Sequence, residues 1–82
     1  MANDNQFKED FRLIGLKIAY YRKMRGLTQE QLSEKLGYGN VSYIGNIEAP
    51  NVYRTFTLTT LLKIAKALDI SPSKLLDYDT SE

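Results

Sequence analysis

Residues 28–49, TQEQLSEKLGYGNVSYIGNIEA, contain two short periodic segments that are joined by an abrupt corner. The first segment opens with Thr28 and Gln31, which have the spacing of a capping box, where the hydroxyl caps the helix and the amide bonds back to it. Two leucines four residues apart follow and give the segment one apolar stripe. Gly37, a residue typical of helix C-termini, comes directly after them. The stretch therefore predicts a helix over residues 29–36.

The second segment begins after only three residues, 38–40. Asn40 is a favourable N-cap, and Ile44 and Ile47 are spaced so that both face inward on a helix over residues 41–49. A proline stands directly after this segment and cannot continue the helix. Because the link between the two helices is so short, we expect them to cross steeply rather than to lie antiparallel.

The rest of the chain also carries apolar residues at helical spacing, and no run has the alternation of a β-strand. Further helices are predicted over residues 7–25, 58–68 and 72–77. The predicted fold class is all-α, a five-helix bundle over residues 7–77 with the two crossed helices in its middle. Residues 1–6 lack periodicity and are expected to form a disordered tail, and residues 78–82 to form an acidic tail.

Two of these helices have well-defined apolar faces that we expect to be buried. The face of the first helix consists of Phe7, Phe11, Ile14, Ile18 and Tyr21. The face of the fourth helix is wider and consists of Leu58, Leu61, Leu62, Ile64, Ala65 and Leu68.

Composition narrows the possible functions. A chain of 82 residues makes at most one domain, and the absence of cysteine and histidine removes disulfides, thiolate metal sites and the commonest general base. No carboxylate pair or phosphate-cradling loop is visible, so we expect neither an enzyme nor a bound cofactor or metal. No apolar run approaches the roughly 20 residues that span a bilayer, and no signal peptide is visible. We therefore expect a cytoplasmic protein without a membrane partner.

The net charge of +1 is unevenly distributed. Residues 11–68 hold nine basic and three acidic groups, a net charge of +6, whereas residues 1–10 carry −2 and residues 69–82 carry −3. A basic body suits a polyanionic partner such as nucleic acid. An ordinary solvated surface of lysines explains the same count, so charge alone does not choose between the two.

The runs RKMRGLTQEQLSEKLG, YIGNIE and TLTTLLKIAKALDIS occur in this order and together resemble the phage-repressor, or Cro/XRE-like, helix-turn-helix family with its lambda-repressor-like DNA-binding domain. The resemblance covers about residues 12–77. It implies a five-helix domain that binds duplex DNA, commonly as a homodimer on a pseudo-palindromic operator, and usually represses transcription. The corner between Gly37 and Ile44 is one residue longer than the common form of the family.

Under this resemblance the helix over residues 41–49 is the recognition helix, whose N-terminal residues meet base edges in the major groove. Ser42 and Asn46 are four residues apart and share its outer face. An asparagine amide suits adenine, a serine hydroxyl pairs with either donors or acceptors, and Val41 can pack on a thymine methyl group. Tyr43 lies at the margin of this face.

Gly45 is a costly residue at this position, because glycine inside a helix is less favourable than alanine by about 1 kcal/mol. Such a residue indicates that another group approaches the backbone closely. We expect that group to be the DNA backbone or a base edge, which places Gly45 among the base-reading residues. Chance variation at a tolerant position is the alternative.

Affinity is expected to come from phosphate contacts around a recognition helix that itself carries almost no charge. In the family, the glutamine that corresponds to Gln29 contacts a phosphate, and its amide can also brace the recognition helix. Other candidates lie near the corner and in the loop that follows the recognition helix, namely Lys35, Asn40, Asn51, Tyr53, Arg54 and Thr55. Arg12 and Lys17 are further candidates on the first helix.

The resemblance also implies an ion pair between Arg22 on the first helix and Glu48 near the end of the recognition helix. Such a pair would be partly buried and would fix the angle of the recognition helix. At the other end of the chain, Leu75, Leu76 and Tyr78 either cover the core or form a dimer contact, and the sequence leaves both open.

Two functions stay open at this point. The first is a sequence-specific transcriptional regulator that binds duplex DNA. The second is a protein-interaction module of the same fold, such as an antitoxin that holds a toxin, which the modest net charge and the neutral third helix allow. A toxin gene beside this one, or a partner that co-purifies in equal amounts, would favour the second function.

Overall fold

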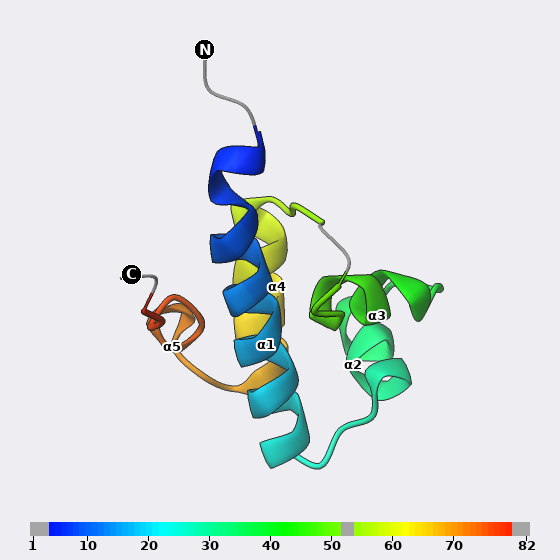
Figure 1. Cartoon of the computed structure of the whole chain (residues 1–82). Helices are drawn as coiled ribbons and strands as arrows, with labels where there is room; N and C mark the ends of the chain where they lie inside the picture. Colours follow the sequence, from blue (N-terminus) through cyan, green and yellow to red (C-terminus); the bar gives the residue numbers. More distant parts are fainter. Residues whose placement is uncertain (1–3, 52–53, 80–82) are drawn as a thin grey trace.

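The computed structural model describes residues 4–51 and 54–79. Its elements are, in order, the 3-10 turn η1 (Asp4–Phe7) and the helices α1 (Lys8–Met24), α2 (Gln29–Leu36), α3 (Ser42–Glu48), α4 (Leu58–Leu68) and α5 (Pro72–Leu75) (Figure 1). The described ranges contain no strand, so the prediction of an all-α fold with five helices is confirmed. Tyr53, one of the expected phosphate contacts, lies outside the described residues.

Helices α2 and α4 occupy their predicted ranges, and the ends of the other three differ from prediction by one or two residues. Residues 4–6, which the sequence assigns to a disordered tail, belong to η1. A 3-10 turn extends a helix N-terminus through bonds that span three residues, so it needs no long periodic apolar pattern to form.

Helix α3 is shorter than the predicted range 41–49 at both ends. At its start, the side-chain Oδ1 of Asn40 accepts the backbone N–H of Ser42 at 2.9 Å, so that the first helical residue is Ser42. At its end, Ala49 has extended backbone angles, φ −70° and ψ 125°. This is the conformation that a following proline imposes on the residue before it, which explains why α3 ends at Glu48.

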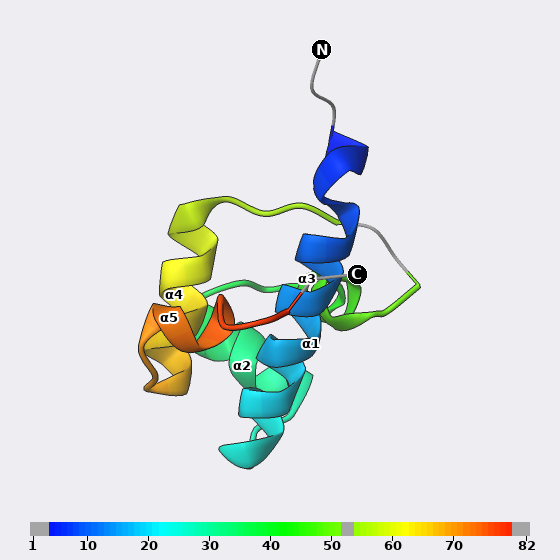
Figure 2. The same ribbon diagram turned by 60° about the vertical axis from the view of Figure 1, so that its left-hand side comes forward.

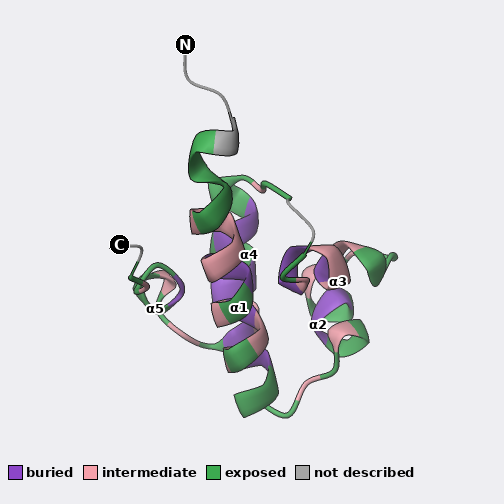
Figure 3. Ribbon diagram, viewed as in Figure 1, coloured by how far each residue is buried: buried purple, intermediate pink, exposed green. Residues whose placement is uncertain are grey.

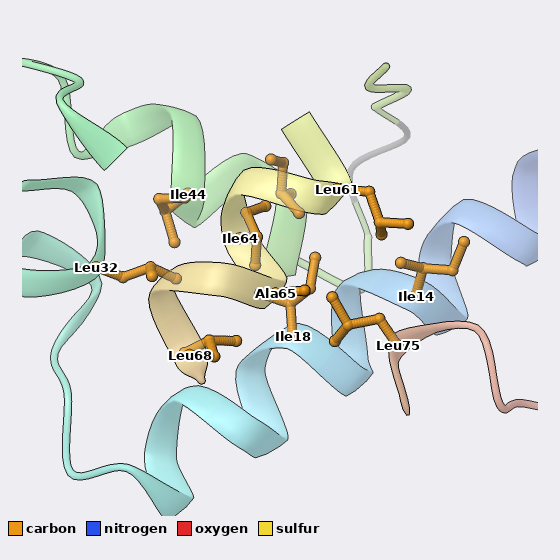
Figure 4. Close-up of a cluster of buried hydrophobic side chains, with 10 residues drawn as sticks. Ile14, Ile18, Leu32, Ile44, Leu61, Ile64, Ala65, Leu68 and Leu75 are labelled. Carbon is orange, nitrogen blue, oxygen red and sulfur yellow. The ribbon is translucent and has the colours of Figure 1, made fainter. Parts of the chain in front are cut away.

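The core lies where the five α-helices meet (Figure 4). Its fully buried members come from every α-helix and include Ile18, Leu32, Ile44, Ile64, Leu68 and Leu75. Three expected members lie outside it, since Phe7, Leu58 and Leu62 remain 47%, 66% and 45% exposed. Helical periodicity marks a face as apolar, but the neighbouring helices decide how much of that face they cover.

Helices α1 and α4 pack side by side, with α2 and α3 on one side of the pair and α5 on the other (Figures 1 and 2). Helix α2 packs on α4, and α3 packs on α1. The corner between α2 and α3 points away from the core and is exposed (Figure 3). None of the described helices is long and apolar enough to cross a membrane.

The C-terminal ends of α1 and α4 are joined by one side chain. Arg25 donates from Nε to the carbonyl oxygen of Leu68 at 2.8 Å and from Nη2 to that of Asp69 at 2.9 Å. These carbonyls belong to the end of α4, where a cation is favourable because the helix dipole is negative there. The guanidinium group of Arg25 therefore binds the end of α4 within the same chain.

Candidate nucleic-acid interface

The predicted capping box at the start of α2 is present. The hydroxyl of Thr28 accepts the backbone N–H of Gln31 at 3.0 Å, and the side-chain Oε1 of Gln31 accepts the backbone N–H of Thr28 at 2.8 Å. Gly37 ends α2 in the left-handed conformation, with φ 82°, which a residue with a side chain adopts at a cost. The chain is thereby turned sharply into the corner.

Ser33 holds this corner in shape, and the sequence reasoning did not identify it. The side chain is buried on α2, and its hydroxyl points at two carbonyl oxygens of the corner, that of Tyr38 at 3.1 Å and that of Asn40 at 3.4 Å. The only sequence signal was a small polar residue directly after the buried Leu32. The Asn40 carbonyl also accepts the backbone N–H of Tyr43 at 3.3 Å, so the hydroxyl serves mainly the carbonyl of Tyr38.

The outer face of α3 carries the predicted base-reading residues. Val41 and Ser42 are exposed, whereas Tyr43 and Asn46 are half-buried. Within the described ranges, no hydrogen bond involves the Asn46 side chain, so its amide keeps both donor and acceptor for a ligand. Since Ile44 and Ile47 are buried on the opposite face, α3 presents its polar face outward.

Glu48 connects the end of α3 to α1 and α2. The predicted ion pair is present in bidentate form, with Arg22 Nε 2.7 Å from Oε2 and Arg22 Nη2 3.0 Å from Oε1. Both residues are more than 90% buried, at 8% and 7% exposure. The remaining guanidinium nitrogen, Nη1, donates to the carbonyl oxygen of Leu27 at 2.6 Å. This pair fixes α3 against α1 and against the segment that leads into α2.

Gln29, an expected phosphate contact, braces α3 in this structure. Its Nε2 donates to Glu48 Oε1 at 2.9 Å. Its Oε1 lies 3.4 Å from the position that a Cβ on Gly45 would occupy. A side chain of α2 therefore lies at ordinary contact distance from the position of a Gly45 Cβ, and the approach of DNA to Gly45 stays a prediction. A phosphate contact of Gln29 has to use the second amide N–H or the backbone.

A second glycine, Gly15 on α1, was missed at the sequence level. A Cβ at this position would overlap the carbonyl oxygen of Ile47 on α3. The signal in the sequence was a glycine between Ile14 and Ile18, inside a helix where glycine is unfavourable. The backbones of α1 and α3 touch here because no side chain separates them.

The candidate cations do not all face the corner. Arg12 is paired with Glu9 on α1 through two hydrogen bonds of 2.9 and 2.6 Å, and this contact lowers the pKa of the Glu9 carboxyl. Lys17 lines a hollow on the α5 side of α1, beside Tyr20 and Tyr78. The remaining candidates in the described ranges, Lys35, Asn51, Arg54 and Thr55, are exposed. No group of histidine, cysteine or acidic side chains in the described part of the chain is arranged to hold a metal.

The sequence resembles known regulators over most of its length. Residues 18–75 match a model of the helix-turn-helix family. Control protein C.SmaI of Serratia marcescens is 39% identical over 70 residues, which make up 85% of this chain and 80% of that protein. The HTH-type transcriptional regulator SinR of Bacillus subtilis (strain 168) is 37% identical over 65 residues, 79% of this chain and 57% of SinR. The chain thus spans little more than half of SinR's length.

Two solved structures share the fold. The restriction-modification controller protein C.AhdI from Aeromonas hydrophila superposes with a TM-score of 0.73 at 36% identity, covering 82% of this chain and 97% of that chain. SinR, a master regulator for biofilm formation, was solved in complex with DNA. It superposes with a TM-score of 0.69 at 38% identity, covering 78% of this chain and 98% of that chain.

Proposed function

This chain belongs to the helix-turn-helix family, and from that premise we propose that it is a transcriptional regulator, specifically a repressor, that binds duplex DNA in a sequence-specific manner. Helix α3 enters the major groove, with Val41, Ser42 and Asn46 at base edges. One observation carries the proposal. Val41 and Ser42 at the start of α3 are exposed and Asn46 on the same face is half-buried, while Glu48 at the far end is held by Arg22 and Gln29. A reading helix needs this combination of exposed polar side chains and a fixed angle.

Phosphate contacts supply the affinity in this proposal. The proposed contacts are Lys35, Asn40, Asn51, Arg54 and Thr55, which are exposed and do not belong to α3, together with Tyr53, which lies outside the described residues. Cations that contact phosphates strengthen binding to every sequence, whereas the neutral side chains of α3 discriminate among sequences. The protein works on DNA in the cytoplasm, and it has no catalytic role.

The test uses duplexes from the DNA upstream of the protein's own gene, with affinity measured by fluorescence anisotropy at several salt concentrations. Asn46→Ala is expected to reduce the preference for the operator over a scrambled duplex. Arg54→Ala is expected to weaken binding to both duplexes equally and to reduce the salt dependence. Lys74→Ala, on α5, serves as the control with unchanged binding. Equal loss of affinity for both duplexes in Asn46→Ala and Arg54→Ala would contradict this assignment of the reading face.

We further propose that the regulator acts as a homodimer on a pseudo-palindromic operator. Leucines that contribute little to the core support a contact between copies, since Leu62 on α4 and Leu76 after α5 are 45% and 48% exposed. Sedimentation equilibrium of the wild type and of Leu62→Glu tests this proposal. A dimer that Leu62→Glu dissociates is the expected result, and a monomer at every concentration contradicts it.

A protein partner, such as a toxin, is a second candidate function of the same domain. Leu58 favours it, because this leucine at the start of α4 is 66% exposed and lies outside the core. Co-expression with the neighbouring gene products tests it. A product that co-purifies in equal amounts, and that Leu58→Glu releases, supports this function, and the absence of any such product contradicts it.

A further inference from the structure

The corner between α2 and α3 has an aromatic hollow on one side. The hollow has a volume of about 580 Å³ and is lined by Gly37, Tyr38, Gly39, Asn40 and Tyr43. The two tyrosine rings meet edge to face, with their centroids 5.1 Å apart and an angle of 81° between their planes. Neither glycine has a neighbouring atom within 4 Å of the position of a Cβ, so the backbone there is open to an approaching group.

A lysine from α4 lies over Tyr38, one of the residues that line this hollow. The Nζ atom of Lys63 is 5.9 Å from the centroid of the Tyr38 ring, a position in which the ring face attracts the ammonium group. Lys63 is exposed, and none of the ion pairs among the described residues involves it. Its charge is therefore oriented by Tyr38 and is available to an external anion.

The groups in the hollow are suited to donate hydrogen bonds. In the described part of the chain, the hydroxyls of Tyr38 and Tyr43 have no hydrogen-bond partner. The side-chain oxygen of Asn40 accepts the backbone N–H of Ser42, which leaves the amide N–H groups of Asn40 for another acceptor. No carboxylate lines this side of the corner. A cation with nearby donors and no acidic group matches the requirements of a phosphodiester.

A second hollow at the corner, which shares Tyr38 and Gly39 with the first, has the opposite charge. A smaller hollow of about 240 Å³ is lined there by Glu30, Ser33, Glu34, Tyr38, Gly39 and Val41. Glu30 and Glu34 lie one turn apart on α2, and both are exposed. Carboxylates repel a DNA backbone. The two hollows therefore differ in charge, which is the property that most strongly affects phosphate binding.

We infer that the hollow with Lys63, Tyr38 and Tyr43 holds the sugar–phosphate backbone of the duplex whose bases α3 reads. The inference rests on the proposed function and adds a site on α4 to it. Asn40 and Tyr43 lie directly beside Val41 and Ser42, so a backbone in this hollow flanks the base pairs that α3 contacts. The charge difference across the corner then fixes the side on which this strand passes.

The test compares two lysines of the same helix. Lys63→Gln is expected to lower affinity about three- to tenfold for operator and scrambled duplexes alike, and to reduce the slope of log affinity against log salt by about 1. Lys66→Gln, the matched control, removes the same charge from α4 beside the α5 hollow and is expected to leave both quantities unchanged. Lys63→Arg keeps the charge and is expected to retain most of the affinity. Thermal unfolding of each variant checks that the fold is intact.

Failure of this inference is distinguishable from failure of the proposed function. If the wild type binds its operator specifically but Lys63→Gln has the same affinity and salt slope, the backbone does not lie in this hollow. If Lys63→Gln weakens binding to one sequence only, Lys63 reads bases and the inference is likewise wrong. If the wild type itself shows no preference for any upstream duplex, the proposed function is wrong.

Discussion

Gly15 on α1 and Ile47 on α3 lie in backbone contact. A methyl group added to Gly15 would overlap the carbonyl oxygen of Ile47 and would lie 3.2 Å from its carbonyl carbon. Ile47 is buried on the face of α3 that is turned away from Val41 and Ser42. The distance between α1 and α3 at this point is therefore set by the absence of a side chain at residue 15.

Gly15→Ala is the first prediction. Alanine is the better helix former, but the added methyl group has to push two backbones apart, so we expect a net loss of stability of about 1–3 kcal/mol. Urea unfolding monitored by circular dichroism measures it. Gly39→Ala is the control, because nothing lies within 4 Å of its Cβ position and its φ is not left-handed. Equal stability of the two variants would show that α1 and α3 separate without cost.

The second prediction concerns the buried pair of Arg22 and Glu48. Arg22→Met leaves the carboxylate of Glu48 buried with only the Gln29 amide as a side-chain donor, and we expect a loss of about 3–5 kcal/mol. The double variant Arg22→Met/Glu48→Leu removes both charges and is expected to recover much of that loss. A double-mutant cycle in urea gives the coupling between the two residues.

The exposed pair of Arg12 and Glu9 provides the comparison for this cycle. Its two hydrogen bonds are as short as those of the buried pair, but both residues face solvent, which screens their attraction. We expect no measurable coupling between Arg12 and Glu9. Additive losses at Arg22 and Glu48 would contradict the view that these two residues act as one unit.

The features that the sequence predicts well depend on neighbours within one or two helical turns. Thr28, Gln31 and Gly37 mark both ends of α2 by their own chemistry, and the observed helix covers the predicted range. The pair of Arg22 and Glu48 joins distant segments, and it was expected only because the chain resembles a family with a known arrangement.

The features that sequence reasoning missed depend on which part of the backbone packs against the residue in the folded protein. Ser33 and Gly15 give only weak signals within their own helices, and their roles arise from the corner and from Ile47 respectively. At Gly45 the sequence suggests an approaching group and favours DNA, and the structure adds Gln29 as a neighbour that the sequence did not suggest. Periodicity identifies a residue that needs a neighbour without identifying that neighbour.

The third prediction tests whether Gln29 or DNA is the group that restricts Gly45. In a Gln29→Ala background, Gly45→Ala is expected to raise stability by about 1 kcal/mol, the full difference in helix propensity. In the wild type the gain should be smaller, because the new methyl group meets Gln29 Oε1 and weakens the bond from Gln29 to Glu48. Thermal unfolding of the four proteins measures both gains. Equal gains, together with weaker operator binding by Gly45→Ala, would identify DNA as the approaching group after all.

The fourth prediction concerns the contact between the C-terminal segment and α1. The hydroxyl of Tyr78 donates to Asp10 Oδ1 at 3.0 Å. Burial of the ring, and then the hydrogen bond and the negative charge of Asp10, raise the pKa of Tyr78 above its ordinary value of 10.0. The folded state therefore favours the neutral phenol. The stability that this contact contributes is present in full below about pH 10 and is lost as the pH rises through the higher folded value.

Tyr78→Phe removes the hydroxyl, and we expect it to lower stability near pH 7 by on the order of 1 kcal/mol, the usual contribution of one hydrogen bond to a charged or polar partner. As the pH rises from 7 to 11, the melting temperature of the wild type should approach that of Tyr78→Phe. The reason is that only the wild type loses the contact when Tyr78 ionises. Tyr20→Phe is the control, since Tyr20 is 56% exposed and its curve should run parallel to that of the wild type. Parallel curves for Tyr78→Phe as well would mean that the hydroxyl does not hold the C-terminal segment against α1 in solution.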